Sequence, residues 1–286
     1  MEYLLIPLAC FLAAAKILIQ SKFAKDKSRT PVDAIFFNGI ICLTGAVFLW
    51  LVLDVQITAA ALLAGLIIGA VNLSYQLFYV SAFACGPISL TTLISSVSMV
   101  VPIVFSAIVY HEPLNVSRAL GILATIASLY FSTVHLGKNK FHLKWILFTA
   151  LAFLANCTST ILMKVYLKSF AVGDSSSFVA VHFTSSAILS LLLYLILTGR
   201  GKRCTYPIGK AVVFTGVSIG VILGCFNLIY AYAMSVLDAT LLLPLYNGAT
   251  TLLVTLGSAL LMKERLNRRQ YIGVLLGIIA IVLMSL

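Results

Sequence analysis

The sequence predicts an all-α integral membrane protein with ten transmembrane helices, arranged as two inverted five-helix repeats. Three observations carry this prediction: the composition, ten apolar segments of spanning length, and one motif that occurs twice. Hydrophobic residues make up 62% of the 286 residues and charged residues only 9%, whereas soluble domains carry about 25% charged residues. A chain this apolar has too few polar groups to cover a surface in water, so we expect lipid to be its solvent.

Ten segments are long and apolar enough to be transmembrane helices, which need about 20 mostly apolar residues each. They are Tyr3–Gln20, Val32–Leu53, Thr58–Ala84, Ile88–Tyr110, Asn115–Leu136, Leu143–Leu167, Ser176–Leu197, Lys210–Val236, Ala239–Met262 and Gln270–Leu286. The connectors between them are short and leave no room for a soluble domain.

A repeated motif divides the chain into two halves, residues 1–137 and 138–286. His111–Gly121 aligns without a gap on Lys263–Gly273, and Glu112 then matches Glu264. Each copy follows the fourth helix of a five-helix set. Because five is odd, the second half must enter the membrane from the opposite side, which predicts a pseudo-two-fold axis in the membrane plane.

The repeated motif also resembles a known family. Glu-x-Leu, a polar stretch, a glycine and an apolar helix close each half, and this pattern is similar to the EamA-type carriers of the drug/metabolite transporter superfamily. The copy from Lys263 to Leu286 is a close match, and the copy that contains Pro113 is looser. The resemblance covers essentially the whole chain. It implies a ten-helix carrier that exports or exchanges small metabolites, amino acids or drugs.

The net charge of +11 reports membrane orientation rather than nucleic-acid binding, because the basic residues lie in short connectors. The connectors after the first, fifth, seventh and ninth predicted helices hold Lys22, Lys25, Lys27, Arg29, Lys138, Lys140, Lys144, Arg200, Lys202, Arg203, Lys210, Lys263, Arg265, Arg268 and Arg269. The opposite face has little more than Arg118 and Lys168. Basic connectors stay in the cytoplasm, so both termini are expected outside a multi-pass protein of the plasma membrane. The resemblance implies the reverse, since many EamA-type carriers are thought to have termini inside.

Glycines spaced four apart predict close helix packing rather than catalysis. Gly216-Val-Ser-Ile-Gly220 matches the serine-hydrolase motif G-x-S-x-G, but that motif requires a strand-to-helix turn. Here it lies in an apolar helix, and Gly65 and Gly69 repeat the spacing in the first half. We therefore expect helix contacts in lipid and no enzyme. Six widely spaced cysteines indicate small buried hydrophobic residues, with no metal and no cofactor.

Charged side chains near the spans are expected to be structural. Lys16 and Lys164 are placed near helix ends, where a lysine extends to the membrane interface, and a role facing an anionic substrate is secondary. Glu112 and Glu264 are expected to cap helices or to pair with Lys263, Arg265 or Arg268. The related small multidrug resistance proteins carry a glutamate in their first helix where this chain has Lys16, which argues against cationic drugs.

Uncharged polar residues at mid-depth indicate a substrate site between the halves. The candidate residues are Asn72, Tyr75, Gln76, Tyr79, Ser95, His182, Asn227, Tyr230, Tyr246 and Asn247. They occur on matching helices of each half, where a repeat-interface site is expected. His182 is the one candidate that could titrate there, although a helix-to-helix hydrogen bond explains it equally well. Pro102 and Pro244 are expected to kink the fourth and ninth spans.

The sequence thus favours a secondary active transporter, an exporter or exchanger of a small polar or zwitterionic metabolite that works by alternating access. Two alternatives remain open at this stage. One is a lipid-linked sugar flippase, and the other is a non-transporting membrane subunit. An intramembrane enzyme is the weakest option. The expected partners are the solute and the lipid bilayer but no nucleic acid, and monomer and homodimer both remain open.

Overall fold

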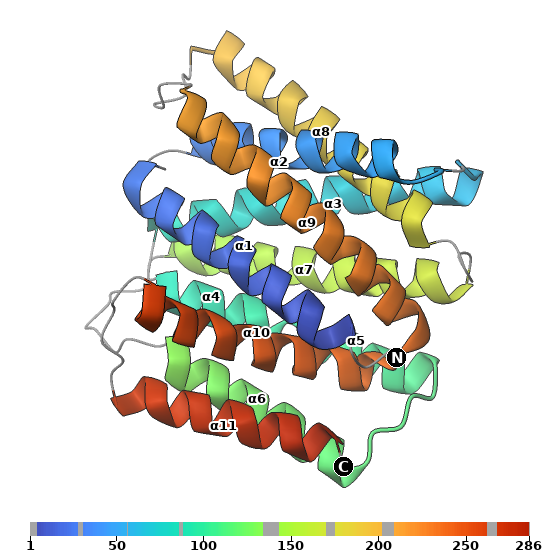
Figure 1. Ribbon diagram of the computed structural model, residues 1–286, viewed down its shortest axis with the longest axis vertical. Helices are drawn as coiled ribbons and strands as arrows, with labels where there is room; N and C mark the ends of the chain where they lie inside the picture. The colour runs from blue at the N-terminus through green and yellow to red at the C-terminus, as the bar shows by residue number, and fades with distance from the viewer. Residues whose placement is uncertain are drawn as a thin grey trace.

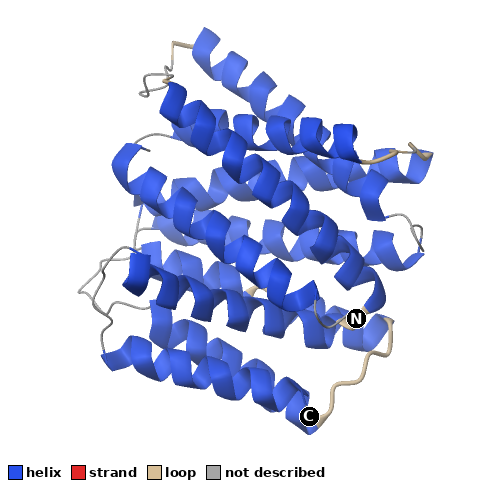
Figure 2. Cartoon of the chain, in the orientation of Figure 1, coloured by secondary structure: helices blue, strands red, loops and turns tan. Residues whose placement is uncertain are grey.

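The computed structural model describes residues 5–27, 31–55, 57–85, 88–133, 143–169, 175–201, 209–261 and 268–285, and within them the regular secondary structure is entirely helical (Figure 2). The helices are α1 (Leu5–Lys27), α2 (Pro31–Val52), α3 (Ala59–Cys85), α4 (Ile88–Val97), α5 (Val100–Val109), α6 (Val116–Thr133), α7 (Leu143–Ser169), α8 (Ser175–Gly199), α9 (Lys210–Val236), α10 (Ala239–Leu261) and α11 (Arg268–Ser285).

The helices lie side by side across the molecule, and the chain begins and ends at the same edge (Figure 1). Six of them, α2, α3 and α7 to α10, are long and apolar enough to cross a membrane. Three shorter apolar stretches add to these: Ile6–Ile19, Ile94–Val109 and Val116–Phe131. Large apolar side chains such as Leu51 and Leu143 are each 81% exposed. Such a surface suits lipid and not water, so the chain is a multi-pass membrane protein.

The fourth predicted span, Ile88–Tyr110, is not one continuous helix, which agrees with the distortion expected at Pro102. It is split into α4 and α5 by a turn at Ser98 and Met99. Pro102 has no N–H to donate to the carbonyl of Ser98 four residues earlier. That carbonyl instead accepts from the Val101 N–H at 3.3 Å and the Cys157 thiol at 3.5 Å. Pro244, by contrast, lies inside the continuous helix α10.

Helix α7 also satisfies the polar groups that the break exposes. The Asn156 side-chain amide donates to the Ser95 carbonyl oxygen at 3.1 Å and to the Ser98 hydroxyl at 2.7 Å. Irregular backbone at membrane depth is tolerated only where protein or water replaces the lost hydrogen bonds. Asn156 is therefore a helix-packing residue.

The helix contacts show an internal symmetry that matches the two predicted halves. If α1–α6 and α7–α11 are superposed, with α4 and α5 counted as one span, most of the helix contacts have a partner. Helix α3 packs on α7 and α8, and equivalently α9 packs on α1 and α2. The pairs α2 with α8 and α6 with α11 each join matching helices of the two halves. The packing therefore agrees with a two-repeat architecture.

The predicted glycine contacts are confirmed and occur at these symmetric interfaces. A Cβ added at Gly65 on α3 would lie 2.6 Å from Val181 Cγ1 on α8. A Cβ at Gly220 on α9 would lie 2.7 Å from the carbonyl oxygen of Ile41 on α2. Only a glycine allows the backbones to approach this closely. Ser218, the nucleophile of the apparent hydrolase motif, donates its hydroxyl to the Phe214 carbonyl of its own helix at 2.9 Å.

Candidate substrate-binding site

Four of the predicted tyrosines come together from both halves of the chain. The rings of Tyr75 and Tyr79 on α3 stack with centroids 5.2 Å apart, and those of Tyr230 on α9 and Tyr246 on α10 are 5.1 Å apart. The Tyr75 phenol is within electrostatic range of the phenols of Tyr79 and Tyr246. We call Tyr75, Tyr79, Tyr230 and Tyr246 the tyrosine cluster. It presents apolar ring faces together with hydroxyl groups, which suits a solute of mixed polarity.

The second predicted group, Asn72 with His182, is held by contacts within the protein. The Asn72 side-chain amide Nδ2 lies 2.5 Å from His182 Nε2, and the Ser159 hydroxyl donates to Asn72 Oδ1 at 3.2 Å. Because Oδ1 accepts, Nδ2 must be the donor, and His182 Nε2 therefore accepts as a neutral imidazole. These bonds join α3 to α7 and α8. They match the expectation that His182 makes a helix-to-helix hydrogen bond.

The predicted amides differ in how much hydrogen-bonding capacity they keep. Asn227 and Asn247 each donate to the carbonyl four residues earlier, Leu223 at 2.9 Å and Leu243 at 2.8 Å. Neither side-chain oxygen accepts a hydrogen bond from a described residue. Gln76 makes no hydrogen bond to any residue in the described part of the chain. All three are half-buried, so they retain groups that a solute can use.

The buried ion pair between Glu112 and Lys164 was not foreseen. Their charged atoms lie 2.9 Å apart, and their side chains are only 4% and 1% exposed. The ammonium of Lys164 also donates to the carbonyls of Met234 at 3.2 Å and Leu237 at 2.9 Å. The expectation that Lys164 reaches the interface is wrong, because Glu112 and the end of α9 satisfy it inside the protein.

The expectation that Glu112 caps a helix is confirmed, although its partner is Lys164 and not Lys263, Arg265 or Arg268. The other carboxylate oxygen of Glu112 accepts from the Thr240 N–H at the start of α10 at 3.1 Å. A negative charge is favourable at that helix terminus. Glu264, the matching residue, lies outside the described residues.

A second ion pair joins the halves beside the first. Arg118 on α6 lies 3.1 Å from Asp238 and donates to the Thr240 hydroxyl at 3.0 Å. The Asn115 side chain accepts from the Arg118 N–H at 2.8 Å, which makes Asn115 the N-terminal cap of α6. We call Glu112, Arg118, Lys164, Asp238 and Thr240 the latch, because they tie the α5–α6 loop of the first half to the second half.

The latch also shows how the halves are oriented. Helix α10 begins beside Glu112 and runs 23 residues to Leu261, about 34 Å along its axis. The motif that contains Glu112 follows the fourth span of the first half, and α10 ends where the matching motif begins. Glu112 and Leu261, the last described residue before the second copy, therefore lie at opposite edges of the helix bundle (Figure 1). This is the arrangement that the inverted repeat predicts.

Lys16 lies in the middle of its helix, so the expectation that it is near a helix end is wrong. Helix α1 runs from Leu5 to Lys27, which leaves about 16 Å of helix on either side of Lys16. Lys16 is half-buried, and the Cys42 thiol on α2 is the group that acts on it electrostatically.

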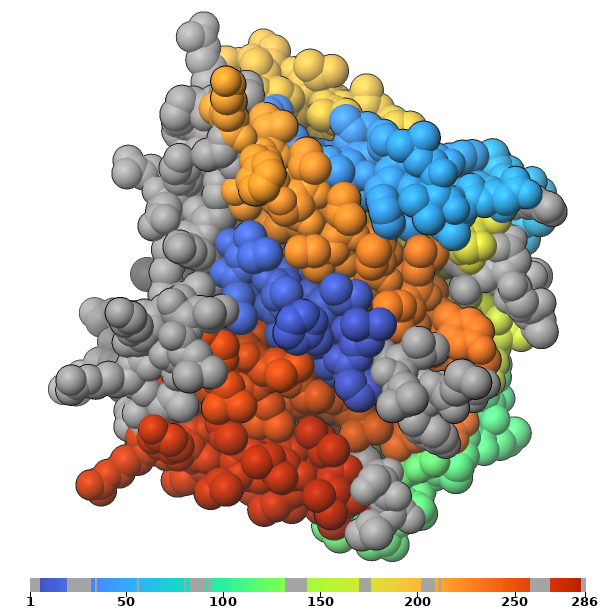
Figure 3. Space-filling view, in the orientation of Figure 1, coloured from blue at the N-terminus to red at the C-terminus, as the bar shows by residue number. Residues whose placement is uncertain are grey.

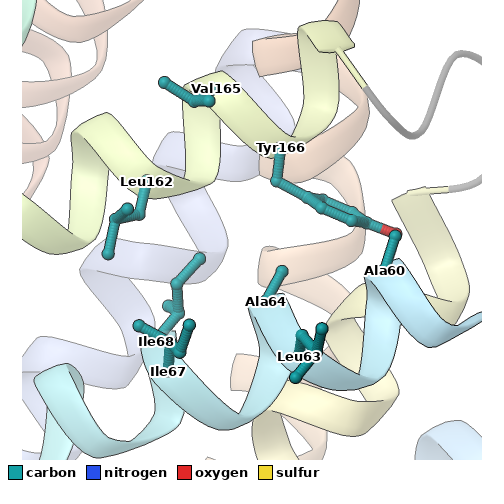
Figure 4. Close-up of a pocket in the computed structure, with 8 residues that line it drawn as sticks. All are labelled: Ala60, Leu63, Ala64, Ile67, Ile68, Leu162, Val165 and Tyr166. Carbon is teal, nitrogen blue, oxygen red and sulfur yellow. The ribbon is translucent and has the colours of Figure 1, made fainter.

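An apolar groove of about 310 Å³ lies between α3 and α7 (Figure 4). It is lined by Ala60, Leu63, Ala64, Ile67, Ile68, Leu162, Val165 and Tyr166. Leu63 and Ile67 are 62% and 51% exposed, so the groove is on the lateral surface. None of the predicted site residues lines it. Ile68 precedes Asn72 by about one helical turn, and Leu162 follows Ser159 by about one helical turn. The groove therefore ends beside the hydrogen-bonded pair of Asn72 and Ser159.

Comparison with known proteins agrees with the architecture. The model of the EamA-like transporter family matches residues 1–134 and 143–286, one copy for each half. One solved crystal structure superposes with a TM-score of 0.78 at 17% sequence identity, covering 97% of this chain and 95% of that one. At this identity the likeness shows the fold alone. No curated protein matches the chain.

Proposed function

Because this chain belongs to the EamA-like transporter family, it is a multi-pass membrane transporter, and we propose that it carries a small polar or zwitterionic metabolite. In this proposal it is a secondary active exporter or exchanger of the plasma membrane. The tyrosine cluster is the observation that carries the proposal, because α3 of one half and α9 and α10 of the other build it together. A site shared by two halves is what alternating access requires.

The proposed site consists of the tyrosine cluster with Gln76, Asn227 and Asn247. Gln76 adjoins Tyr75 on α3, and Asn247 adjoins Tyr246 on α10. Their free oxygens and N–H groups favour a solute with both donors and acceptors. Asn72, Ser95 and His182 form a surrounding layer in which Asn72 and His182 are fixed by their mutual hydrogen bond.

Alternating access also requires that the path to one face of the membrane can be closed. The contacts of the latch can close it. It joins the halves through two ion pairs, one of which is buried. In the proposed cycle these contacts close one face, and the solute leaves on that face when they separate. The exposed basic residues Arg200, Lys210 and Arg268 lie at helix ends on the opposite edge (Figure 1). By the positive-inside rule that edge is cytoplasmic, so the latch faces outward and the termini lie outside.

Ligand-induced stabilisation followed by transport tests this proposal. Purified protein is screened by thermal unfolding against amino acids, nucleobases, sugars and organic cations, because a binder raises the melting temperature by mass action. Each stabilising compound is then loaded into proteoliposomes, and uptake of its radiolabelled form by counterflow is measured. We expect saturable uptake of at least one polar metabolite. If no member of a broad panel is bound or moved, the non-transporting subunit becomes the better account.

The lateral groove favours one second candidate, the lipid-linked sugar flippase. A flippase must hold an acyl or prenyl chain beside a polar head group, and the groove between α3 and α7 is apolar and next to Asn72. Replacing Ala64 by Trp would fill it. A flippase would lose activity in this variant, whereas the proposed metabolite carrier should retain its counterflow rate.

A further inference from the structure

The two lysines inside the helix bundle differ in how their charge is compensated. Lys164 is paired with Glu112 at 2.9 Å and makes two more hydrogen bonds to carbonyls. Lys16 has no ion pair or hydrogen bond with any residue in the described part of the chain. The group that acts on it is the Cys42 thiol, which offers no negative charge in its protonated form. The charge of Lys164 is therefore compensated within the protein, whereas the charge of Lys16 has no anionic partner among the described residues.

Lys16 points into the helix bundle rather than into lipid. Helix α1 lies between α9 and α10 on one face of the molecule (Figure 3). Residues three and seven positions before Lys16 share its helix face. These are Ala13 and Ala9, which are 2% and 3% exposed and pack with Phe226 on α9.

The same helix face leads directly to the tyrosine cluster. Phe226, which contacts Ala9 and Ala13, stacks on Tyr230 at 5.4 Å and on Tyr246 at 5.5 Å. The Cys10 thiol donates to the Tyr246 carbonyl at 3.9 Å, and Lys16 follows Cys10 by six residues, about 9 Å along the helix. Phe226 thus links the helix face that carries Lys16 to the tyrosine cluster.

An ammonium at this depth is unfavourable without a partner. Lysines within the apolar part of a membrane helix are rare, and they usually face a pathway or a paired charge. Apolar residues surround this position, since Ile19 and Leu223 pack with Ile41 and Ile219 close by. The chain keeps a cation here although a neutral residue would be less costly for folding.

We propose that Lys16 binds an acid group of the transported solute, which makes the substrate an organic anion or a zwitterion such as an amino acid. This inference rests on the proposed transport function and narrows its substrate class. The carboxylate or phosphate of the solute supplies the charge that the described residues do not. The apolar or hydroxylated remainder of the solute lies on the tyrosine cluster. Uncharged sugars and organic cations are then poor substrates.

A panel of small compounds that differ in charge tests, on purified protein, whether Lys16 binds an acid group. The probes are amino acids, monocarboxylates, sugar phosphates, neutral sugars and alkylammonium ions, each scored by thermal unfolding and by counterflow. We expect only compounds with an acid group to stabilise the protein, and comparison of carboxylates with phosphates identifies the group. Lys16→Gln should raise the half-saturating concentration roughly 10- to 100-fold, the loss expected for one charge-assisted hydrogen bond. Lys16→Arg should retain most of the affinity.

Lys210→Gln is the matched control, because Lys210 is an exposed lysine at the start of α9, and it should behave as wild type. The proposal is overturned if the best transported solute lacks an acid group, or if Lys16→Gln and wild type bind an acidic solute equally. Absence of any transport by wild-type protein would instead refute the transporter proposal on which it rests. The two failures are therefore distinguishable.

Chemical rescue separates a charge effect from a folding defect. In a background with the native cysteines replaced by alanine, Lys16→Cys is treated with 2-aminoethyl methanethiosulfonate, which restores a primary ammonium. Methyl methanethiosulfonate, which adds a neutral group, is the control. Binding of the acidic solute should return after the first reagent and not after the second. Equal results with both reagents, or no labelling of the cysteine, would contradict a solute-contacting Lys16.

Discussion

At the scale of single residues, some amide side chains keep free hydrogen-bonding groups, whereas others are fully hydrogen-bonded within the protein. Gln76 and Asn227 keep capacity, whereas Asn72 is bonded at both ends of its amide. We therefore expect Gln76→Ala and Asn227→Ala to weaken counterflow while the yield of folded protein stays near wild type. Ser218→Ala is the control, because its hydroxyl bonds only to its own helix. Normal transport by both amide variants would show that the site lies elsewhere.

The buried ion pair gives a prediction about stability. Lys164→Met leaves the Glu112 carboxylate buried without its counter-charge, which typically costs about 3–5 kcal/mol. Replacing both residues, with Glu112→Gln and Lys164→Met, removes the charges together and should restore most of the melting temperature. A double-mutant cycle of thermal unfolding in detergent measures this coupling. Additive losses in the two single variants would contradict the pairing.

At the scale of helices, the close approach of α2 and α9 depends on glycine. Gly220→Ala would place a Cβ 2.7 Å from the Ile41 carbonyl oxygen, and backbone atoms there cannot move aside independently. We expect a lower melting temperature and loss of folded yield. Gly248→Ala on α10 is a matched control, because its Cβ would meet only Thr125 at an ordinary 3.8 Å. Equal tolerance of the two substitutions would contradict the tight α2–α9 interface.

Helix positions and repeats were predictable from the sequence, whereas partners between helices were not. The segment expected from Thr58 to Ala84 is helix α3, Ala59–Cys85, because an apolar run in lipid has helix as its available structure. Pro102 signalled a distortion, but the pairing of Asn156 with the broken helix needs a fold to reveal it. Lys164 was misplaced for the same reason: its partner Glu112 is 52 positions away in the sequence, and no periodicity links them.

At the scale of the whole molecule, the inverted repeat and the charge distribution together fix an orientation that can be measured. His111 is exposed beside the latch, and Arg269 is exposed at the start of α11. In intact cells we expect a membrane-impermeant maleimide to label His111→Cys, and to label Arg269→Cys only after permeabilisation. Labelling of both from the same side would contradict the inverted repeat. The reversed pattern would keep the repeat and place the termini inside.

The candidate site is predictable in composition but not in detail. Matching polar helices in the two halves located the tyrosines, because polar groups in lipid must face protein or a wet interior. Which groups remain free could not be read from the sequence, since Asn72 and Gln76 lie on the same helix face and differ only in what surrounds them. Lys16 and Lys164 were both expected to reach the interface, and only the fold shows that Lys164 is bonded to Glu112 and to two carbonyls.

Solute protection of the tyrosine cluster tests the central claim, that the solute binds between the halves, most directly. Tyr75→Cys and Tyr246→Cys are made separately in a background without native cysteines, and their rates of reaction with a small thiol reagent are measured in proteoliposomes. The account predicts that a transported metabolite slows labelling at both positions, one in each half, with the same half-saturating concentration as transport. If transport continues while neither cysteine is protected, the solute does not bind at the tyrosine cluster.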